Sequence, residues 1–256
     1  YDKGMRFSDK YVVVTGAASG LGLAIAQGAA AEGAIVIALD RVASPFEHSR
    51  ICDIADEEQV KSALAGFSRI DAVVNSAGIA RRAKVDETPM ADFDAVMAVN
   101  VRGAFLVSKY ALPLMRKAGG AILHLSSGVA TTGTRNRAAY TASKGAILSL
   151  TRNMALDYAA DRVRVNCLCP GFVNTPLLAT MPSERRARLA ALHPLGRMGE
   201  PEDLVPMALL LPIDQVMPQL WQTLPAPHWL PQVPPLLSQK FQLEIVLPEL
   251  ILPTSA

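Results

Sequence analysis

The stretch that decides the fold is YVVVTGAASGLG, residues 11–22. It opens with a β-branched run typical of a buried strand, and the alanine-rich residues 21–31 that follow have a helix-compatible composition. Glycines separate the two elements, because glycine permits a tight turn and lets the backbone approach a bound phosphate. Gly16, Gly20 and Gly22 have the spacing G-x3-G-x-G, and the start of the following helix offers unpaired N–H groups. This arrangement predicts a site for the pyrophosphate of a dinucleotide.

The alternation of strand and helix continues along the chain. Apolar strands are expected at residues 34–39, 71–74, 121–125 and 163–168, and helices near residues 56–66, 90–117 and 139–160. Strands this apolar must be covered by helices on both faces. The sequence therefore predicts an α/β fold, a doubly wound (Rossmann) parallel sheet that forms a single domain over residues 5–210.

Composition and charge narrow the class of partner. Of the 256 residues, 50% are hydrophobic and 19% are charged, which excludes a disordered or fibrous chain. Lys and Arg number 25 against 23 Asp and Glu, and the net charge of +2 is too weak and too scattered for a nucleic-acid partner. A small-molecule ligand fits this balance better.

Neither a membrane span nor a metal site is expected. No apolar run approaches the roughly 18 residues of a membrane-spanning helix, and the start of the chain lacks a signal-peptide layout, so we expect a cytoplasmic protein without a membrane partner.

Cys52, Cys167 and Cys169 form an odd set that is typical of small buried residues in a reducing compartment, so no metal site is expected from them.

Asp40 bears on the choice of dinucleotide. It closes the second strand 18 residues after Gly22, close to the spacing of the acid that hydrogen-bonds an adenosine ribose hydroxyl. A carboxylate there would repel a 2′-phosphate, and no cation stands in the glycine loop beside Ser19, so NAD is favoured over NADP. The neighbouring Arg41 favours the opposite choice, and Asp40 is also compatible with a helix cap.

Tyr140 and Lys144 are the candidate proton-transfer residues. Their i, i+4 spacing at the start of the helix expected at 139–160 puts the phenol and the ammonium on one face. A free phenol has a pKa near ~10 and is a poor base at neutral pH unless a nearby positive charge stabilises the phenolate. Taken alone, the pair is also compatible with two solvated helix residues.

Several further motifs join these residues in one order along the chain. They are TGAASGLG at 15–22, NSAG at 75–78, Asn100, Ser126-Ser127, YTASK at 140–144 and CPGFVNT at 169–175. Together they resemble the short-chain dehydrogenase/reductase family in its NAD-dependent form, over about residues 7–210. The resemblance implies a homotetramer or homodimer and a catalytic tetrad of Asn100, Ser127, Tyr140 and Lys144.

The resemblance also implies a role for each member of the tetrad. Tyr140 would take the proton of a substrate hydroxyl as hydride leaves for the nicotinamide, and Lys144 would stabilise the phenolate and hold the nicotinamide ribose. Ser127 would hydrogen-bond the reacting oxygen, whereas Ser126 is expected to point away, since adjacent strand residues face opposite sides. Asn100 would hold a water for proton relay, although it is also compatible with a polar residue that bends a helix.

A cofactor site follows from the same resemblance. Its expected residues are Gly16, Ser19, Gly20, Leu21, Gly22, Asp40, Asp53, Ile54, Asn75, Ala77, Gly78, Tyr140, Lys144, Pro170, Gly171, Val173 and Thr175. Only 12 residues separate Asp40 from Asp53, so the helix that normally links the second and third strands is expected to be almost absent.

The C-terminal residues 211–256 depart from the family pattern. They hold nine of the 18 prolines, both tryptophans and none of the 17 glycines, which predicts an irregular tail with at most a short strand in residues 242–247. Members of the family end instead with a glycine-containing strand. The switch from glycine to proline motivates the hypothesis of a shifted reading frame or an erroneous C-terminal sequence.

The expected function is hydride transfer between NAD(H) and a secondary alcohol or ketone, with a polar polyol, sugar or hydroxy acid as substrate. Substrate contacts are expected from residues 128–139, from the loop after Thr175 and from the tail. Arg135 and Arg137 lie in that first segment and suit a carboxylate or phosphate, or they belong to a solvated loop. The alternatives are an NADP-dependent 3-ketoacyl-type reductase and a non-catalytic nucleotide-binding protein.

Overall fold

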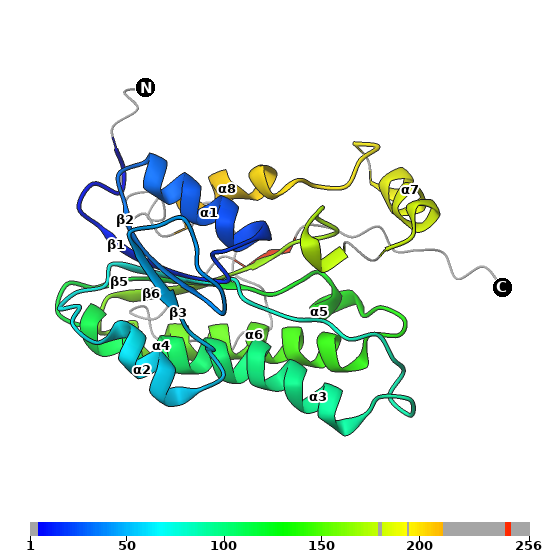
Figure 1. Ribbon diagram of the computed structural model, residues 1–256, viewed down its shortest axis with the longest axis horizontal. Helices are drawn as coiled ribbons and strands as arrows, with labels where there is room; N and C mark the ends of the chain where they lie inside the picture. The colour runs from blue at the N-terminus through cyan, green and yellow to red at the C-terminus, as the bar shows by residue number, and fades with distance from the viewer. Residues whose placement is uncertain (1–4, 179–180, 194, 212–243, 247–256) are drawn as a thin grey trace, which may run out of the picture.

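One parallel sheet with helices on both faces forms the body of the molecule (Figure 1). The computed structural model describes residues 5–178, 181–193, 195–211 and 244–246. The sheet has seven strands in the order β3-β2-β1-β4-β5-β6-β7. Their bounds are β1 (Tyr11–Thr15), β2 (Ile35–Asp40), β3 (His48–Ile51), β4 (Ala72–Asn75), β5 (Gly120–Leu125), β6 (Val163–Cys169) and β7 (Glu244–Val246). The predicted doubly wound Rossmann sheet is confirmed.

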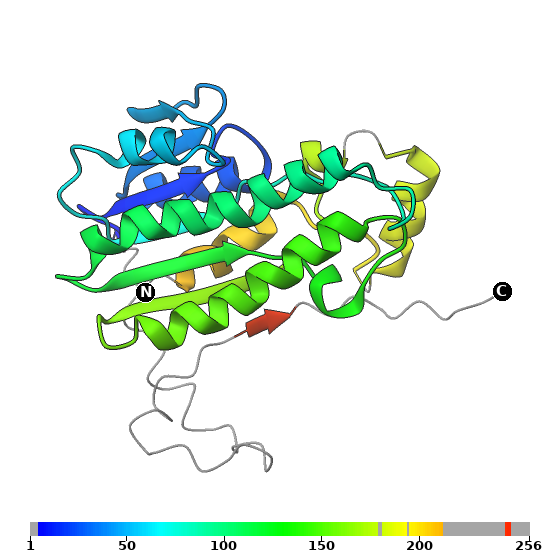
Figure 2. The same cartoon turned by 90° about the horizontal axis from the view of Figure 1, so that it is seen from below.

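Two helical layers sandwich this sheet (Figures 1 and 2). The helical segments are α1 (Gly20–Ala31), α2 (Glu57–Leu64), α3 (Met90–Met97), the π-helical η1 (Ala98–Gly103), α4 (Ala104–Met115), α5 (Val129–Thr132), α6 (Ala138–Asp157), the 3-10 helix η2 (Pro176–Leu178), α7 (Ser183–Leu192) and α8 (Pro201–Leu210). Helices α1 and α8 cover one face of the sheet, and α2, α4 and α6 cover the other.

The central strands are buried on both sides because each face packs against helices. In β1, Val12 and Val14 belong to the core layer formed with α1 and α8, whereas Val13 belongs to the layer formed with α2, α4 and α6. This two-sided burial explains why the strand is continuously apolar rather than alternating. The strand order reverses between β1 and β4, so a crevice for a ligand is expected at the carboxyl ends of these two strands.

The connection from β2 to β3 is short, as expected from the spacing of Asp40 and Asp53. Residues 41–47 contain no helix. Strand β3, the sequence HSRI, is polar and half-exposed and pairs with β2 at the edge of the sheet.

Helices α3 and α4, joined by η1, form one long helix that packs in the core. Met90–Met115 is one helical stretch of 26 residues that is long and apolar enough, by length and composition, to cross a membrane. Half of its most apolar window is buried inside the protein, and α4 packs against β4 and β5, which is the behaviour of a core helix.

Of the tail, the structure describes Leu211 and Glu244–Val246. The latter residues form β7, which pairs in parallel with the end of β6 and confirms the short strand expected within 242–247. The other tail residues lie outside the described ranges. Cys52, Cys167 and Cys169 are buried free thiols, as expected.

Candidate active site

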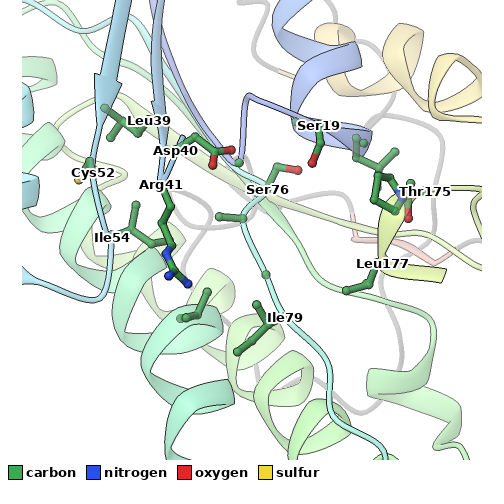
Figure 3. Close-up of a pocket in the computed structure, with 18 of the residues that line it drawn as sticks. Ser19, Leu39, Asp40, Arg41, Cys52, Ile54, Ser76, Ile79, Thr175 and Leu177 are labelled. Atoms are coloured by element: carbon green, nitrogen blue, oxygen red, sulfur yellow. The ribbon is translucent and has the colours of Figure 1, made fainter. Parts of the chain in front are cut away.

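A cleft of about 280 Å³ opens at the carboxyl ends of β1, β2 and β4 (Figure 3). Eleven of the predicted cofactor residues line it: Gly16, Ser19, Gly20, Leu21, Gly22, Asp40, Asp53, Ile54, Ala77, Gly78 and Thr175. The walls also contain apolar residues that the motifs did not reveal, namely Leu39, Cys52, Ile79, Val99, Pro176 and Leu177. The cleft therefore combines the glycine loop with apolar side chains, as is typical of small-molecule and cofactor sites.

Steric constraints explain the glycine spacing in the loop. A Cβ atom on Gly22 would lie 2.2 Å from the carbonyl oxygen of Gly16, and one on Gly16 would lie 2.9 Å from Cα of Ala77. Gly16 also has a φ of +70°, the left-handed region that side chains rarely adopt.

The glycine loop leads directly into the N-terminus of α1, where backbone N–H groups are available as donors. Ser19 is the N-cap, but its side chain makes no capping hydrogen bond, and the first turn of α1 contains no acidic residue. The first N–H groups of a helix lack intrahelical acceptors and carry a partial positive charge. Residues 16–22 thus fit the pyrophosphate of a dinucleotide.

Asp40 lies at the end of β2 and binds the loop rather than capping a helix. Its Oδ2 accepts a hydrogen bond from the Ala18 N–H at 3.0 Å, and its Oδ1 accepts one from the Val42 N–H at 3.3 Å. Arg41 lines the same cleft, where Figure 3 shows its side chain extending beside Ile54. An anion and a cation therefore stand next to each other at this end of the cleft.

Tyr140 and Lys144 lie on the same face of α6, as their spacing predicts. Both are buried, with exposed fractions of 8% and 5%. The Lys144 Nζ lies 5.6 Å from the Tyr140 ring centroid and donates a hydrogen bond to the Leu125 carbonyl oxygen at 2.7 Å. Burial lowers the pKa of Lys144 to about 8, so its ammonium is still largely charged at neutral pH.

The two serines after β5 point in different directions, as expected. The Ser126 hydroxyl donates to the Lys144 carbonyl oxygen at 2.8 Å and so braces α6 from inside. The Ser127 Oγ accepts a long bond of 3.4 Å from the Val129 N–H. Within the described residues, the Ser127 hydroxyl hydrogen has no acceptor.

Asn100 joins the segment after β4 to α6 through hydrogen bonds. Its Oδ1 accepts a hydrogen bond from the Ile79 N–H at 2.8 Å, and its Nδ2 donates to the Ile79 carbonyl oxygen and to the Ser143 Oγ, both at 2.9 Å. It lies in the π-helical segment η1, where the helix is locally widened. A Cβ atom on Gly78 would lie 3.2 Å from the Asn100 Oδ1 and 3.6 Å from the Lys144 Nζ, so both side chains lie close to this residue of the cleft wall.

Six residues that were predicted to border the cofactor do not line the cleft, namely Asn75, Tyr140, Lys144, Pro170, Gly171 and Val173. Asn75 is the last residue of a fully buried strand, and its Nδ2 contacts the Ser108 Oγ at 3.1 Å and the His124 Nδ1 at 3.3 Å. Val173 is buried in the core layer with α1 and α8.

The two arginines before Tyr140 differ in their surroundings. Arg135 is exposed, whereas Arg137 is half-buried and its Cζ lies 5.6 Å from the Tyr140 ring centroid. Of the two, only Arg137 is in contact with the candidate catalytic residues.

Comparison with known proteins identifies the family. A family model described as enoyl-(acyl carrier protein) reductase matches residues 16–216. The chain belongs to the short-chain dehydrogenase/reductase family. Members of this family are oxidoreductases that bind a nicotinamide cofactor, and the glycine loop and cleft described above fit such a cofactor.

Relatives with different substrates resemble the chain to a similar degree. The cis-4-hydroxycyclohexanecarboxylate dehydrogenase of Sinomonas cyclohexanicum is 36% identical over 82% of this chain and 92% of its own. A putative gluconate 5-dehydrogenase structure from Beutenbergia cavernae, with bound NADP, is 36% identical, with a TM-score of 0.77 and coverage of 82% and 92%. The 3-ketoacyl-(acyl-carrier-protein) reductase of Brucella melitensis, complexed with NADH, is 30% identical, with a TM-score of 0.74 and coverage of 81% and 92%.

Proposed function

We propose that this protein is an NAD-dependent dehydrogenase that interconverts a secondary alcohol and a ketone on a polar polyol, sugar or hydroxy acid. The placement of Lys144 and Tyr140 side by side on α6, with the Lys144 Nζ close to Gly78 in the cleft wall, carries this proposal. When bound, the nicotinamide ring supplies the hydride acceptor or donor.

Residues of the protein carry out the proton transfer that accompanies hydride transfer. In oxidation the Tyr140 oxygen accepts the proton of the substrate hydroxyl, and in reduction it returns that proton to the carbonyl oxygen. The buried Lys144 ammonium favours the negatively charged phenolate, because few water molecules screen the interaction. Ser127 donates its available hydroxyl hydrogen to the reacting oxygen and fixes its position.

Asn100 supports this arrangement as a positioning residue. It joins the backbone of Ile79 to Ser143 of α6, so it ties the wall of the cleft to the helix that carries Tyr140 and Lys144. The bound cofactor and the proton-transfer residues would thereby keep a fixed distance.

Asp40 supports NAD as the cofactor. Its carboxylate is held at the cleft by the Ala18 N–H, where it would accept hydrogen bonds from a ribose diol and repel a 2′-phosphate. Arg41 in the same wall supports the second candidate, an NADP-dependent 3-ketoacyl-type reductase. Structural relatives with either cofactor bound resemble the chain.

The experiment for the proposed function is a screen for turnover. Polyols, sugars and hydroxy acids are offered with NAD at alkaline pH, and the corresponding ketones are offered with NADH and NADPH at neutral pH. We expect turnover with a preference for NADH. A preference for NADPH would favour the reductase, and cofactor binding without turnover of any substrate would favour a nucleotide-binding protein that is not an enzyme.

We also propose that residues 5–210 form the cofactor-binding and catalytic domain of a cytoplasmic homo-oligomer, and that residues 211–256 stem from a shifted reading frame or a sequence error. The composition of those residues supports this division. Intact mass and peptide mapping of protein from the natural gene test the tail, because recovery of its proline-rich peptides would show it to be genuine. Native mass spectrometry tests the oligomeric state.

A further inference from the structure

Three arginines from separate parts of the chain come together beside Tyr140. They are Arg82 in the loop after β4, Arg137 at the N-terminus of α6 and Arg185 in the first turn of α7. Figures 1 and 2 place these segments at the same end of the molecule, beyond the carboxyl ends of the strands.

Backbone and ring contacts fix two members of this arginine cluster (Arg82, Arg137 and Arg185). The Ala138 N–H donates to the Ala83 carbonyl oxygen at 3.3 Å, so Arg82 and Arg137 flank a hydrogen bond that joins their two segments. The Arg137 guanidinium carbon lies 5.6 Å from the Tyr140 ring centroid. The cluster thus adjoins the phenol that we propose as the proton acceptor.

The third member, Arg185, lies in α7, which Figures 1 and 2 place at the same end of the molecule as the N-terminus of α6. Burial lowers the pKa of Arg137, the charge of Tyr140 raises it, and the charges of Arg82 and Arg185 lower it. Burial likewise lowers the pKa of Arg185, with an added contribution from Arg82. Arg137 and Arg185 are both half-buried, so water screens this repulsion less than at an open surface.

No carboxylate among the described residues neutralises the cluster. By contrast, the adjacent arginines are engaged elsewhere, since Arg81 pairs with Asp92 at 3.2 Å and Arg186 donates hydrogen bonds to Asn174 and to the Leu178 carbonyl oxygen. Two of the three arginines are half-buried, and no carboxylate of the described residues pairs with them. This arrangement costs electrostatic free energy in the unliganded protein. An anionic ligand would remove that cost.

We propose that Arg82, Arg137 and Arg185 bind an anionic group on the substrate, so that the enzyme acts on hydroxy acids and their keto counterparts rather than on neutral polyols or sugars. The guanidinium fork suits the planar geometry of a carboxylate, and it also binds sulfonate and phosphate oxygens. This inference rests on the proposed function, because it assigns the substrate class of that same site.

The test compares an acid with its uncharged amide, which has nearly the same shape. The ratio of KM for 3-hydroxybutanamide to KM for 3-hydroxybutyrate is measured in the wild type and in Arg82→Ala, Arg137→Ala and Arg185→Ala. We expect a ratio of tenfold or more in the wild type, and a fall of about tenfold in each variant. The ratio is used because a change in proton transfer affects both substrates alike.

The matched control is Arg81→Ala, which removes a neighbouring positive charge that pairs with Asp92 and is not part of the cluster. It should leave the ratio unchanged. Congeners with a sulfonate or a phosphate, 2-hydroxypropane-1-sulfonate and 2-hydroxypropyl phosphate, show which anion is preferred.

A binding measurement separates this inference from the proposed function. Acetoacetate and acetoacetamide are titrated calorimetrically into the protein with and without NAD. Tighter binding of acetoacetate that Arg137→Ala abolishes supports the anion site even if turnover is never seen. Equal binding of the two compounds, or turnover of the amide as efficient as that of the acid, would overturn the inference while leaving a dehydrogenase in place.

Discussion

The Nζ atom of Lys144 lies 5.6 Å from the centroid of the Tyr140 ring, one helical turn away, and both side chains are buried. The two side chains therefore share one buried turn of α6. The proposed proton transfer depends on this pair.

Replacing Lys144 by Met should slow turnover by roughly 10²–10⁴-fold, the usual contribution of general acid–base catalysis, because the phenolate loses its positive neighbour. Steady-state kinetics measure the loss. Lys109→Met is the matched control, because Lys109 is an exposed lysine paired with Glu57 on the surface, and it should leave turnover unchanged. Equal rates for the two variants would remove Lys144 from the mechanism.

The same lysine predicts a dependence of stability on pH. Burial lowers the pKa of Lys144 from 10.5 to about 8, so between these values the folded state releases a proton that the unfolded state keeps. The stability of the wild type relative to Lys144→Met should therefore rise by about 2 kcal/mol from pH 7.5 to pH 10. Urea unfolding at both pH values gives the difference. A constant difference would mean that Lys144 is not desolvated.

His124 predicts a change in the acid range. It is fully buried in β5, and burial lowers its pKa from 6.5 to about 4. Between these values the unfolded state binds a proton that the folded state does not, so stability falls as the pH drops from 6.5 to 4. His124→Gln should abolish about 2 kcal/mol of that loss when urea unfolding is compared at pH 7 and pH 4.5. His48→Gln, at the sheet edge, is the control; an unaltered acid sensitivity in His124→Gln would refute the assignment.

Gly22→Ala should abolish NADH binding and destabilise the protein, because the new methyl group would meet the Gly16 carbonyl oxygen at 2.2 Å. Fluorescence titration with NADH measures the affinity. Gly145→Ala serves as a control inside α6, where a Cβ atom meets nothing within 4 Å and should raise stability by roughly 0.5–1 kcal/mol. Normal NADH affinity in Gly22→Ala would show that the loop does not hold the pyrophosphate.

Asp40→Asn should reduce the preference for NADH over NADPH by about tenfold or more, because the repulsion of a 2′-phosphate disappears while Arg41 remains. The ratio of kcat/KM for the two cofactors is the measurement. Asp56→Asn, which keeps the N-cap of α2 and does not line the cofactor cleft, should leave the ratio unaltered. If Asp40→Asn also leaves it unaltered, another residue selects the cofactor.

Elements with a strong local signal could be predicted closely from the sequence. The β-branched run before the glycine loop defines β1 at residues 11–15, and the helices expected near 56–66 and 139–160 occur at 57–64 and 138–157. Strand β3 carried no signal, because its sequence HSRI is polar and half-exposed at the sheet edge. The π-helical turn η1 within residues 90–117 could not be predicted from the hydrophobic period, which one such turn barely alters, although Asn100 was compatible with a bend in this helix.

The candidate site likewise contains residues that local sequence predicts and residues that only the tertiary fold brings together. The glycine loop and the Tyr140–Lys144 pair are local in sequence, so their geometry follows from turn sterics and helical spacing. Arg82 and Arg185 lie 55 and 48 residues from Arg137, and tertiary packing alone brings them to it. A motif does not tell whether the side chain at a strand end faces the cleft or the core, so the contacts of Asn75 with Ser108 and His124 could not be predicted from it.

Tyr140→Phe tests the central claim most directly, because it deletes one hydroxyl and leaves the ring that lies near both Arg137 and Lys144. Turnover of the best substrate and the affinity for NADH are measured in this variant and in Tyr158→Phe, at the end of the same helix. We expect Tyr140→Phe to bind NADH normally and to lose turnover, whereas Tyr158→Phe keeps both. Wild-type turnover in Tyr140→Phe would contradict the assignment of this phenol as the proton acceptor.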